Sequence, residues 1–244
     1  MPAELLIDLG HSRLKWGWRR GNLLDRETIA ACNLEQPAPF SAVLGDNATE
    51  RAWVCGQSSP MAVDWLEALA RQYSLSLEWI RTGQMKLPVE PAYPGLGADR
   101  WLALQWPWRQ TRSALAVIDC GSAITVDVVD GCGCHRGGWI LPGLRAARQG
   151  LLARAPGLPD PPIEDRAVNA PAMDSASAVA GGALLAAIGG IQRAVDFAQA
   201  YLDSALELWI TGGDAAVLGS GFDHPLRHDP HLVLAGLAMA GGSS

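Results

Sequence analysis

The sequence predicts an α/β fold that is built from two similar halves. Short apolar runs typical of buried strands alternate with longer segments whose apolar residues recur at helical spacing, which favours layered sheets and helices over a bundle or a sandwich. The pattern Asp-x-Gly ends a strand-like run at Asp8 and again at Asp119, about half the chain later, and each time a second strand-like run follows. This repetition predicts an internal duplication, with domains over residues 1–112 and 113–244.

Size and composition restrict the class of protein further. A chain of 244 residues, 49% hydrophobic and 18% charged, can bury a core without disulfide or metal staples, and wholesale disorder is excluded. The net charge of −6 predicts no binding to nucleic acid or to a membrane surface. The five cysteines, an odd number, favour reduced thiols, and the first residues lack the basic-then-apolar order of a secretory signal. We therefore expect a cytoplasmic protein.

Apolar periodicity and turn residues place the elements of each half. Both halves are expected to open with a hairpin, and the second hairpin turns at Asp130-Gly131. Five prolines within residues 156–171 predict a loop, and the uncharged run over residues 175–191 is too short to span a bilayer and predicts a buried helix at a subunit contact. The expected strands are 5–9, 13–18, 52–55, 76–80, 114–118, 124–129, 137–141 and 206–210, and the expected helices are 61–73, 144–153, 175–202 and 232–240.

The two Asp-x-Gly turns have the chemistry of a nucleoside triphosphate site. Glycine lacks a Cβ, so backbone N–H groups can approach phosphate oxygens, and the neighbouring carboxylate can hold Mg²⁺ directly or through water. Ser12, Lys15 and Ser122 lie where they can contact phosphates, and Gly212-Gly213 ends a later strand. A single Asp-x-Gly is more often an ordinary turn after a strand, but two in corresponding places favour phosphate binding.

Phosphoryl transfer also needs a group that accepts the proton of the attacking hydroxyl. Asp99 is the candidate, because the glycine-rich residues 93–98 lead into a helical pattern and place Asp99 and Arg100 near a helix N-terminus. The alternative is a carboxylate that only complements the helix dipole. The residues alone leave both readings open.

Five motifs in this order resemble the type III pantothenate kinases. They lie at residues 8–15, 93–100, 119–127, 137–143 and 211–213. The resemblance implies a duplicated two-domain α/β fold of the acetate kinase, sugar kinase, heat-shock chaperone ATPase and actin type. It also implies a homodimer, with a helical dimer region in the second half, that uses ATP to phosphorylate pantothenate in the first step of coenzyme A synthesis.

Each expected site residue follows from the position that matches a family motif. The first ATP phosphate loop is Asp8, Leu9, Gly10, His11, Ser12, Arg13, Leu14 and Lys15, and Ser122 contacts phosphate in the second. Asp99 is the general base, and Asp119 binds the potassium or ammonium ion that the family requires beside Mg²⁺. The residues expected to hold pantothenate are Tyr93, Gly97, Ala98, Asp99, Arg100 and Ser175.

Some features depart from the family pattern or leave alternatives. His11 stands where the family usually has Asn, which affects the geometry of the first loop. Residues 132–135 hold two cysteines and a histidine, fewer ligands than the four of a structural zinc site. The alternatives for the whole chain are another small-molecule kinase on the same fold, and a non-catalytic regulatory or accessory protein that binds nucleotide without turnover.

Overall fold

The computed structural model describes residues 4–46, 49–56, 59–160, 170–222 and 224–241. Its contacts divide the chain into two compact units, Met1–Gln110 together with His231–Ser244, and Thr111–Pro230. The first boundary lies two residues from the expected one. The last stretch of chain differs from the expected division, because it groups with the first unit instead of the second half.

Each unit contains a five-stranded sheet, and the two sheets have the same topology. The orders are β3-β2-β1-β4-β5 and β8-β7-β6-β9-β10. In both, the first three strands form an antiparallel meander and the last two run parallel to the first. The repeated topology confirms the duplicated α/β fold. The strands are β1 (Glu4–Leu9), β2 (Arg13–Arg20), β3 (Leu23–Asn33), β4 (Arg51–Cys55), β5 (Ser76–Trp79), β6 (Leu115–Cys120), β7 (Ala123–Val129), β8 (His135–Pro142), β9 (Glu207–Thr211) and β10 (Leu226–His228).

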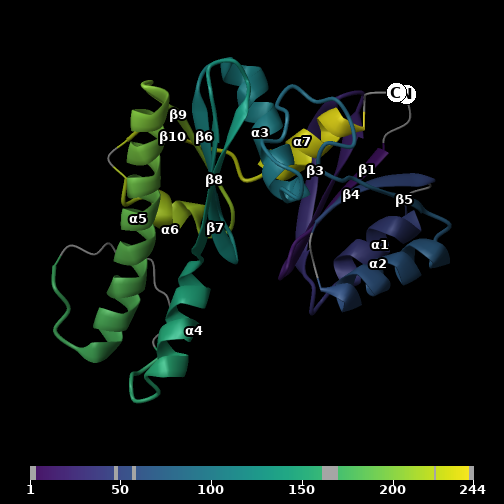
Figure 1. Ribbon diagram of the computed structural model, residues 1–244. Helices are drawn as coiled ribbons and strands as arrows, with labels where there is room; N and C mark the ends of the chain where they lie inside the picture. The colour runs from purple at the N-terminus through teal and green to yellow at the C-terminus, as the bar shows by residue number, and fades with distance from the viewer. Residues whose placement is uncertain (1–3, 47–48, 57–58, 161–169, 223, 242–244) are drawn as a thin grey trace. The chain divides into compact units, whose positions relative to one another are not determined.

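Successive side chains along each strand of the first sheet point to opposite faces of that sheet. Leu5, Ile7 and Leu9 of β1 pack into an apolar core with helices α1 (Ala38–Asp46) and α2 (Pro60–Gln72). The alternate residues therefore point to the opposite face. Helix α7 (Leu232–Ala240) contacts β1, β2, β3 and β4, and Figure 1 shows it in yellow beside these strands.

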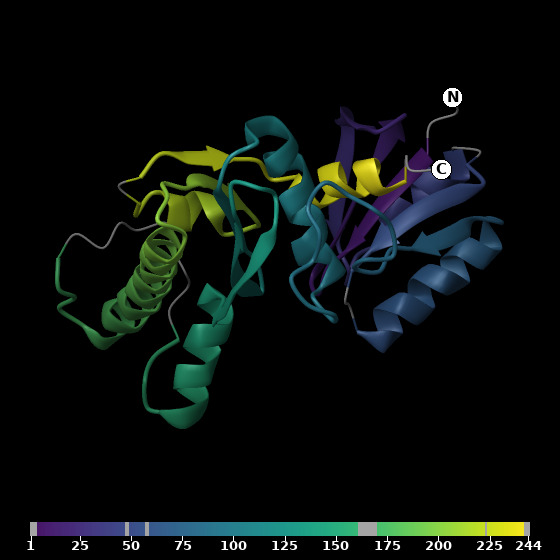
Figure 2. The ribbon, with the colours of Figure 1, turned by 45° about the horizontal axis from the view of Figure 1, so that its top comes forward.

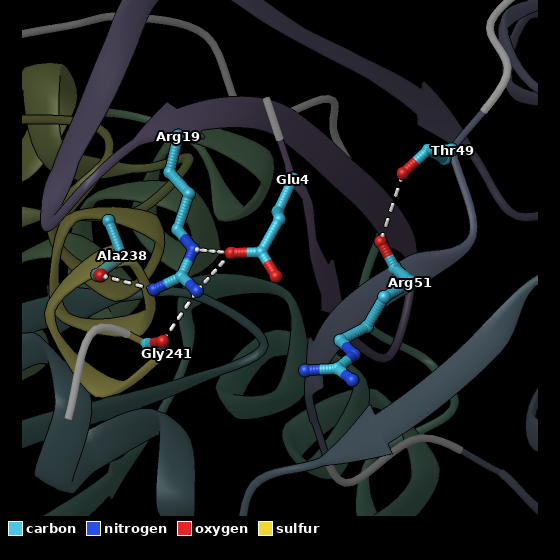
Figure 3. Close-up of polar contacts among 6 residues, drawn as sticks. All are labelled: Glu4, Arg19, Thr49, Arg51, Ala238 and Gly241. Carbon is cyan, nitrogen blue, oxygen red and sulfur yellow. Dashed lines mark hydrogen bonds and ion pairs between the residues drawn. The ribbon is translucent and has the colours of Figure 1, made fainter. Parts of the chain in front are cut away.

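A buried arginine fastens α7 to the first sheet (Figure 3). The Arg19 guanidinium donates to a Glu4 carboxylate oxygen and, at the end of α7, to the carbonyl oxygens of Ala238 and Gly241. It also lies over the Trp53 ring, 5.0 Å from the centroid. Helix α7 follows the second unit in sequence, so these contacts explain why the C-terminal stretch groups with the first unit.

Helices of the second unit pack on one face of its sheet. These are α4 (Leu144–Arg154), α5 (Ser175–Leu202) and the short α6 (Ala215–Gly219), and Figure 2 shows α4 and α5 near each other, as their contacts require. Buried residues from Leu184 to Ala198 of α5 recur at helical spacing and join the core formed by Ile118, Cys120 and Ile124. Helix α5 is long and apolar enough to cross a membrane by length and composition alone, a test that core helices also pass.

The expected helices agree with the structure within one or two residues, and those over 175–202 and 232–240 agree at both ends. The prediction did not include β3, α1, α6 or β10. Of the proline-rich segment, residues 161–169 lie outside the described residues.

Candidate active site

The first Asp-x-Gly turn connects β1 to β2 in the first unit. The backbone N–H of Gly10 donates to the Arg13 carbonyl, 3.0 Å away, which closes the turn. His11, Ser12 and Arg13 are exposed at its tip, and Leu9 and Leu14 are buried on either side of it. The burial of these two leucines fixes the register, so the turn presents its backbone and polar side chains to solvent.

Strand register brings three side chains of this unit to one face of the sheet. Asp8 lies opposite Lys15 on β2 and opposite Cys55 on β4. Because directly opposed residues on neighbouring strands point to the same side, all three lie on the face opposite α1 and α2. A carboxylate and an ammonium group therefore flank the first turn.

Asp99 lies in the first turn of helix α3 (Ala98–Thr111). Its Oδ1 atom accepts from the Arg100 backbone N–H at 2.8 Å, and the Arg100 guanidinium donates to the Tyr93 hydroxyl at 3.2 Å. The Trp101 N–H bonds to the Gly97 carbonyl at 3.1 Å and starts the helix. The structure thus brings Tyr93, Asp99 and Arg100, three of the residues expected to hold an alcohol substrate, together at the start of α3.

The pKa of the Cys55 thiol is affected by both Asp8 and Asp99. Burial raises the pKa of the Cys55 thiol well above its ordinary value, and the carboxylates of Asp8 and Asp99 raise it further. Both carboxylates therefore lie close enough to this thiol to act on its ionisation. Within the first unit, the expected general base and the expected phosphate loop share one neighbourhood.

The second Asp-x-Gly turn connects β6 to β7 and repeats the first. The Gly121 N–H donates to the Ala123 carbonyl at 3.1 Å, and Ser122 is exposed at the tip. Asp119 lies opposite Thr125 on β7 and opposite Thr211 on β9. These three residues point away from the face that packs against α5.

Two glycines lie against the second turn where a side chain would not fit. Gly212 has φ +97°, and a Cβ there would lie 2.4 Å from the Cys120 carbonyl oxygen and 2.6 Å from Asp119 Oδ1. A Cβ at Gly143 would lie 2.5 Å from the Ser122 carbonyl oxygen. The absence of both side chains lets the backbone approach Asp119 and the turn closely.

A second carboxylate, that of Asp214, lies near Cys120 at the end of β6. The Asp214 backbone N–H donates to the Cys120 carbonyl at 3.0 Å, and burial raises the pKa of the Asp214 carboxyl. Burial also raises the pKa of the Cys120 thiol, and the charges of Asp119 and Asp214 add to this shift. The carboxyl ends of β6 and β9 therefore form an acidic region rich in oxygen ligands.

The type III pantothenate kinase profile matches residues 4–196, which is most of the chain. The chain belongs to the type III pantothenate kinase family. A member from Pseudomonas savastanoi pv. phaseolicola is 36% identical, with 97% of this chain and 98% of that protein covered. Members from Alkalilimnicola ehrlichii and Nitrosomonas eutropha are each 32% identical, with 98% and 96% of this chain and 98% and 93% of those proteins covered.

Solved structures of other proteins support the duplicated α/β fold. A protein of Campylobacter jejuni described as a Baf family transcriptional activator is 22% identical, with a TM-score of 0.61 and 96% and 94% of the two chains covered. An activator of 2-hydroxyisocaproyl-CoA dehydratase from Clostridium difficile, with bound ADPNP, is 10% identical, with a TM-score of 0.55 and 98% and 94% covered. At these identities the likeness concerns the fold alone.

The site residues expected from the pantothenate kinase resemblance are divided between the two units. The first loop and residues 93–100 belong to the first unit, and Asp119, Ser122 and Ser175 belong to the second. Ser175 is the exposed first residue of α5, directly after Asp174, whose carboxylate accepts from both the backbone N–H and the hydroxyl of Ser177.

The cysteine and histidine cluster of the sequence separates in the structure. His135 Nε2 lies 3.0 Å from Asp127 Oδ1 in the sheet interior, whereas Cys132 and Cys134 are exposed. Within the described ranges, no three His, Cys, Asp or Glu side chains group as a metal site would require.

Sequence reasoning missed Gly56, which corresponds in the first unit to Gly212. It follows β4 as Gly212 follows β9, has φ +149°, and a Cβ there would lie 2.1 Å from the Leu9 carbonyl oxygen. The signal was available, because Gly56 follows the strand-like run over residues 52–55. Comparing the two halves beyond their Asp-x-Gly turns would have found it.

Proposed function

We propose that this chain transfers the γ-phosphoryl group of ATP to the hydroxymethyl group of pantothenate, which gives 4′-phosphopantothenate and ADP in the first step of coenzyme A synthesis. Family membership supports the reaction and substrate. The observation that carries the site is the strand register of the first unit, which places Lys15 and Cys55 opposite Asp8 on one face of the sheet.

In this proposal Asp99 is the general base. The pantothenate hydroxyl oxygen forms a bond to the γ-phosphorus, the bond from that phosphorus to the bridging oxygen of ADP breaks, and Asp99 accepts the hydroxyl proton. Tyr93, Gly97, Ala98 and Arg100 hold the substrate, and Arg100 has a defined direction because it donates to Tyr93. Ser175 supplies a further hydroxyl in this scheme.

The nucleotide is assigned to the two turns. Residues 8–15 and Ser122 bind phosphates through backbone N–H groups, hydroxyls and the Lys15 ammonium. The donor set at the second turn fits a hard cation, because Asp119 offers carboxylate oxygens and the neighbouring Gly212 has no side chain to fill the space beside them. We assign the potassium or ammonium ion to Asp119 and Mg²⁺ to the phosphates beside Asp8. Bound cations would stabilise the negative charge that develops during transfer.

We also propose that the chain acts as a cytoplasmic homodimer. All five cysteines are free, which fits a reducing compartment. Helix α5 exposes Leu185, Phe197 and Tyr201 to solvent, which supports this helix as the subunit contact. Light scattering of the wild type and of a variant with these three residues changed to Ser tests the assembly.

Turnover tests the whole proposal. Purified protein with Mg²⁺ and ATP should release ADP only when pantothenate is present, and faster in potassium than in sodium buffer. Asp99→Asn should bind ATP normally and lose turnover by about 10²-fold or more. Asp64→Asn, an exposed carboxylate on α2, is the matched control. Nucleotide binding by the wild type without pantothenate-dependent turnover would refute the kinase and support a regulatory protein.

A further inference from the structure

The connection between β5 and α3 carries two residues of the proposed substrate site, Tyr93 and Gly97, but has no regular structure. Residues 80–97 run from the end of β5 to the start of α3 and include Tyr93 and Gly97. Loops of this length are uncommon within a compact domain unless other groups hold them in place. The position of Tyr93 must therefore be set by contacts outside the backbone ladder.

One completely buried side chain provides such contacts. The Gln105 amide on α3 accepts from the Val89 N–H at 2.9 Å and donates to the Val89 carbonyl at 3.0 Å, so it pairs with both polar groups of one loop residue. It also donates to the Trp101 carbonyl at 2.9 Å. Gln105 has no exposed surface, so water does not compete for these bonds.

Trp101 completes the arrangement from the preceding helical turn. Its indole N–H donates to the same Val89 carbonyl at 2.7 Å, and its ring is fully buried. Trp101 and Gln105 are four residues apart and therefore lie on one side of α3. We call Val89, Trp101 and Gln105 the loop clamp. The remaining bond of the clamp, from Gln105 to the Trp101 carbonyl, lies within α3. Trp101 is two residues after Asp99 in the same helix.

We propose that Gln105 is a positioning residue for the alcohol substrate, and that it acts by pairing with Val89 and so fixing Tyr93 relative to Asp99. This inference rests on the proposed function. Val89 precedes Tyr93 by four residues, and the intervening Pro91 restricts the backbone. Near the two ends of the loop, the Thr82 hydroxyl donates to the Leu96 carbonyl at 2.6 Å, and this bond joins those ends. The clamp thus anchors the middle of a loop whose ends are already joined.

The test compares Gln105→Met with Gln110→Met, an exposed glutamine on the same helix. Methionine keeps the volume of Gln105 but leaves the Val89 N–H without its partner. A buried backbone N–H without a partner costs free energy comparable to that of the lost hydrogen bond, so the loop should no longer hold Tyr93 in place. The KM for pantothenate should therefore rise about tenfold or more. The KM for ATP should change less than about twofold, since residues 8–15 make none of these contacts. Gln110→Met should leave both KM values unchanged.

Trp101→Phe removes one donor and keeps the aromatic packing, so it tests the clamp even if Gln105→Met does not fold. Its KM for pantothenate should rise by a smaller factor. In the double variant the KM for pantothenate should rise by more than the product of the two single factors, because in each single variant the other donor still pairs with the Val89 carbonyl. A lower kcat with an unchanged KM for pantothenate in folded Gln105→Met would show a purely structural role and overturn the inference.

Hydrogen exchange separates this inference from the proposed function. In Gln105→Met the amides of residues 89–96 should exchange faster than in the wild type and in Gln110→Met, with or without substrate. Unchanged exchange would overturn the clamp. A wild type that shows no pantothenate-dependent ADP release would refute the proposed function and with it the role in positioning substrate, and the exchange result would still decide whether the clamp holds the loop.

Discussion

Adjacent glycines after β9 offer a stability test in which the two substitutions are chemically identical. At Gly212, φ is +97° and a new Cβ would lie 2.4 Å from the Cys120 carbonyl oxygen and 2.6 Å from Asp119 Oδ1. At Gly213 the φ value is outside the left-handed region and nothing lies within 4 Å of a new Cβ. Alanine therefore meets a backbone carbonyl and a carboxylate at the first position and open space at the second.

The expected loss for Gly212→Ala follows from these two costs. An L-residue in a sparsely populated backbone region costs about 1–3 kcal/mol, and displacing packed atoms costs a further 1–3 kcal/mol or so. The sum, about 2–6 kcal/mol, is a large part of a typical domain stability of roughly 5–15 kcal/mol. Gly213→Ala should change stability by less than about 0.5 kcal/mol.

Urea unfolding followed by tryptophan fluorescence measures both variants, because Trp209 lies on β9 three residues before Gly212. The midpoint should fall for Gly212→Ala and stay near the wild-type value for Gly213→Ala. Equal midpoints for the two variants would refute the close approach of Gly212 to Asp119.

Three further predictions concern the rest of the chain. Arg19→Lys should destabilise the protein by about 2–4 kcal/mol, because a buried guanidinium with three partners is lost, while the exposed neighbour Arg20→Lys should have almost no effect on thermal unfolding. A thiol reagent should label Cys132 and Cys134 in the folded protein but label Cys55 and Cys120 only on unfolding, because burial hides these two thiols and raises their pKa values. Burial acts to raise the pKa of Asp130, but the N–H groups of Cys134 and Cys132 and the Arg136 guanidinium outweigh it and lower the pKa below its ordinary 3.8. Asp130 therefore adds stability that is present above this value and lost as the pH falls below it, so urea midpoints of the wild type and Asp130→Asn should converge as the pH falls below 3.8.

Local patterns in the sequence predicted the elements that their own residues specify. Helix α2 begins at Pro60, directly after Ser59, whose hydroxyl accepts from the Ala62 N–H at 3.3 Å. Such capping groups are local, so a sequence shows them directly. Both Asp-x-Gly hairpins were predicted for the same reason.

The elements that the prediction omitted depend on distant contacts. Strand β3 has no fully buried residue and carries several charged positions, so its own sequence lacks the alternation of a half-buried strand. Its pairing with β2 determines it. The assignment of α7 to the first unit is non-local in the same way, because it depends on Arg19, more than two hundred residues earlier. Gln105 lies in a helix that sequence reasoning followed only from Trp101 to Leu104, and its partner Val89 lies in a loop without periodicity.

The two turns occupy corresponding places in the two units but differ in length and in charge, which supports different roles for them. In each unit a glycine with positive φ, Gly56 or Gly212, lies against the strand that carries the aspartate. The residue opposite the aspartate differs, because Asp8 faces Lys15 whereas Asp119 faces Thr125. Lys15 offsets the charge of Asp8 and gives the first turn an ammonium group for phosphate. At the second turn the residue opposite the aspartate is uncharged, and the carboxylates of Asp119 and Asp214 both act on the Cys120 thiol, which fits the cation that we propose there. This difference in charge supports our proposal that the first turn binds phosphate and the second turn a cation.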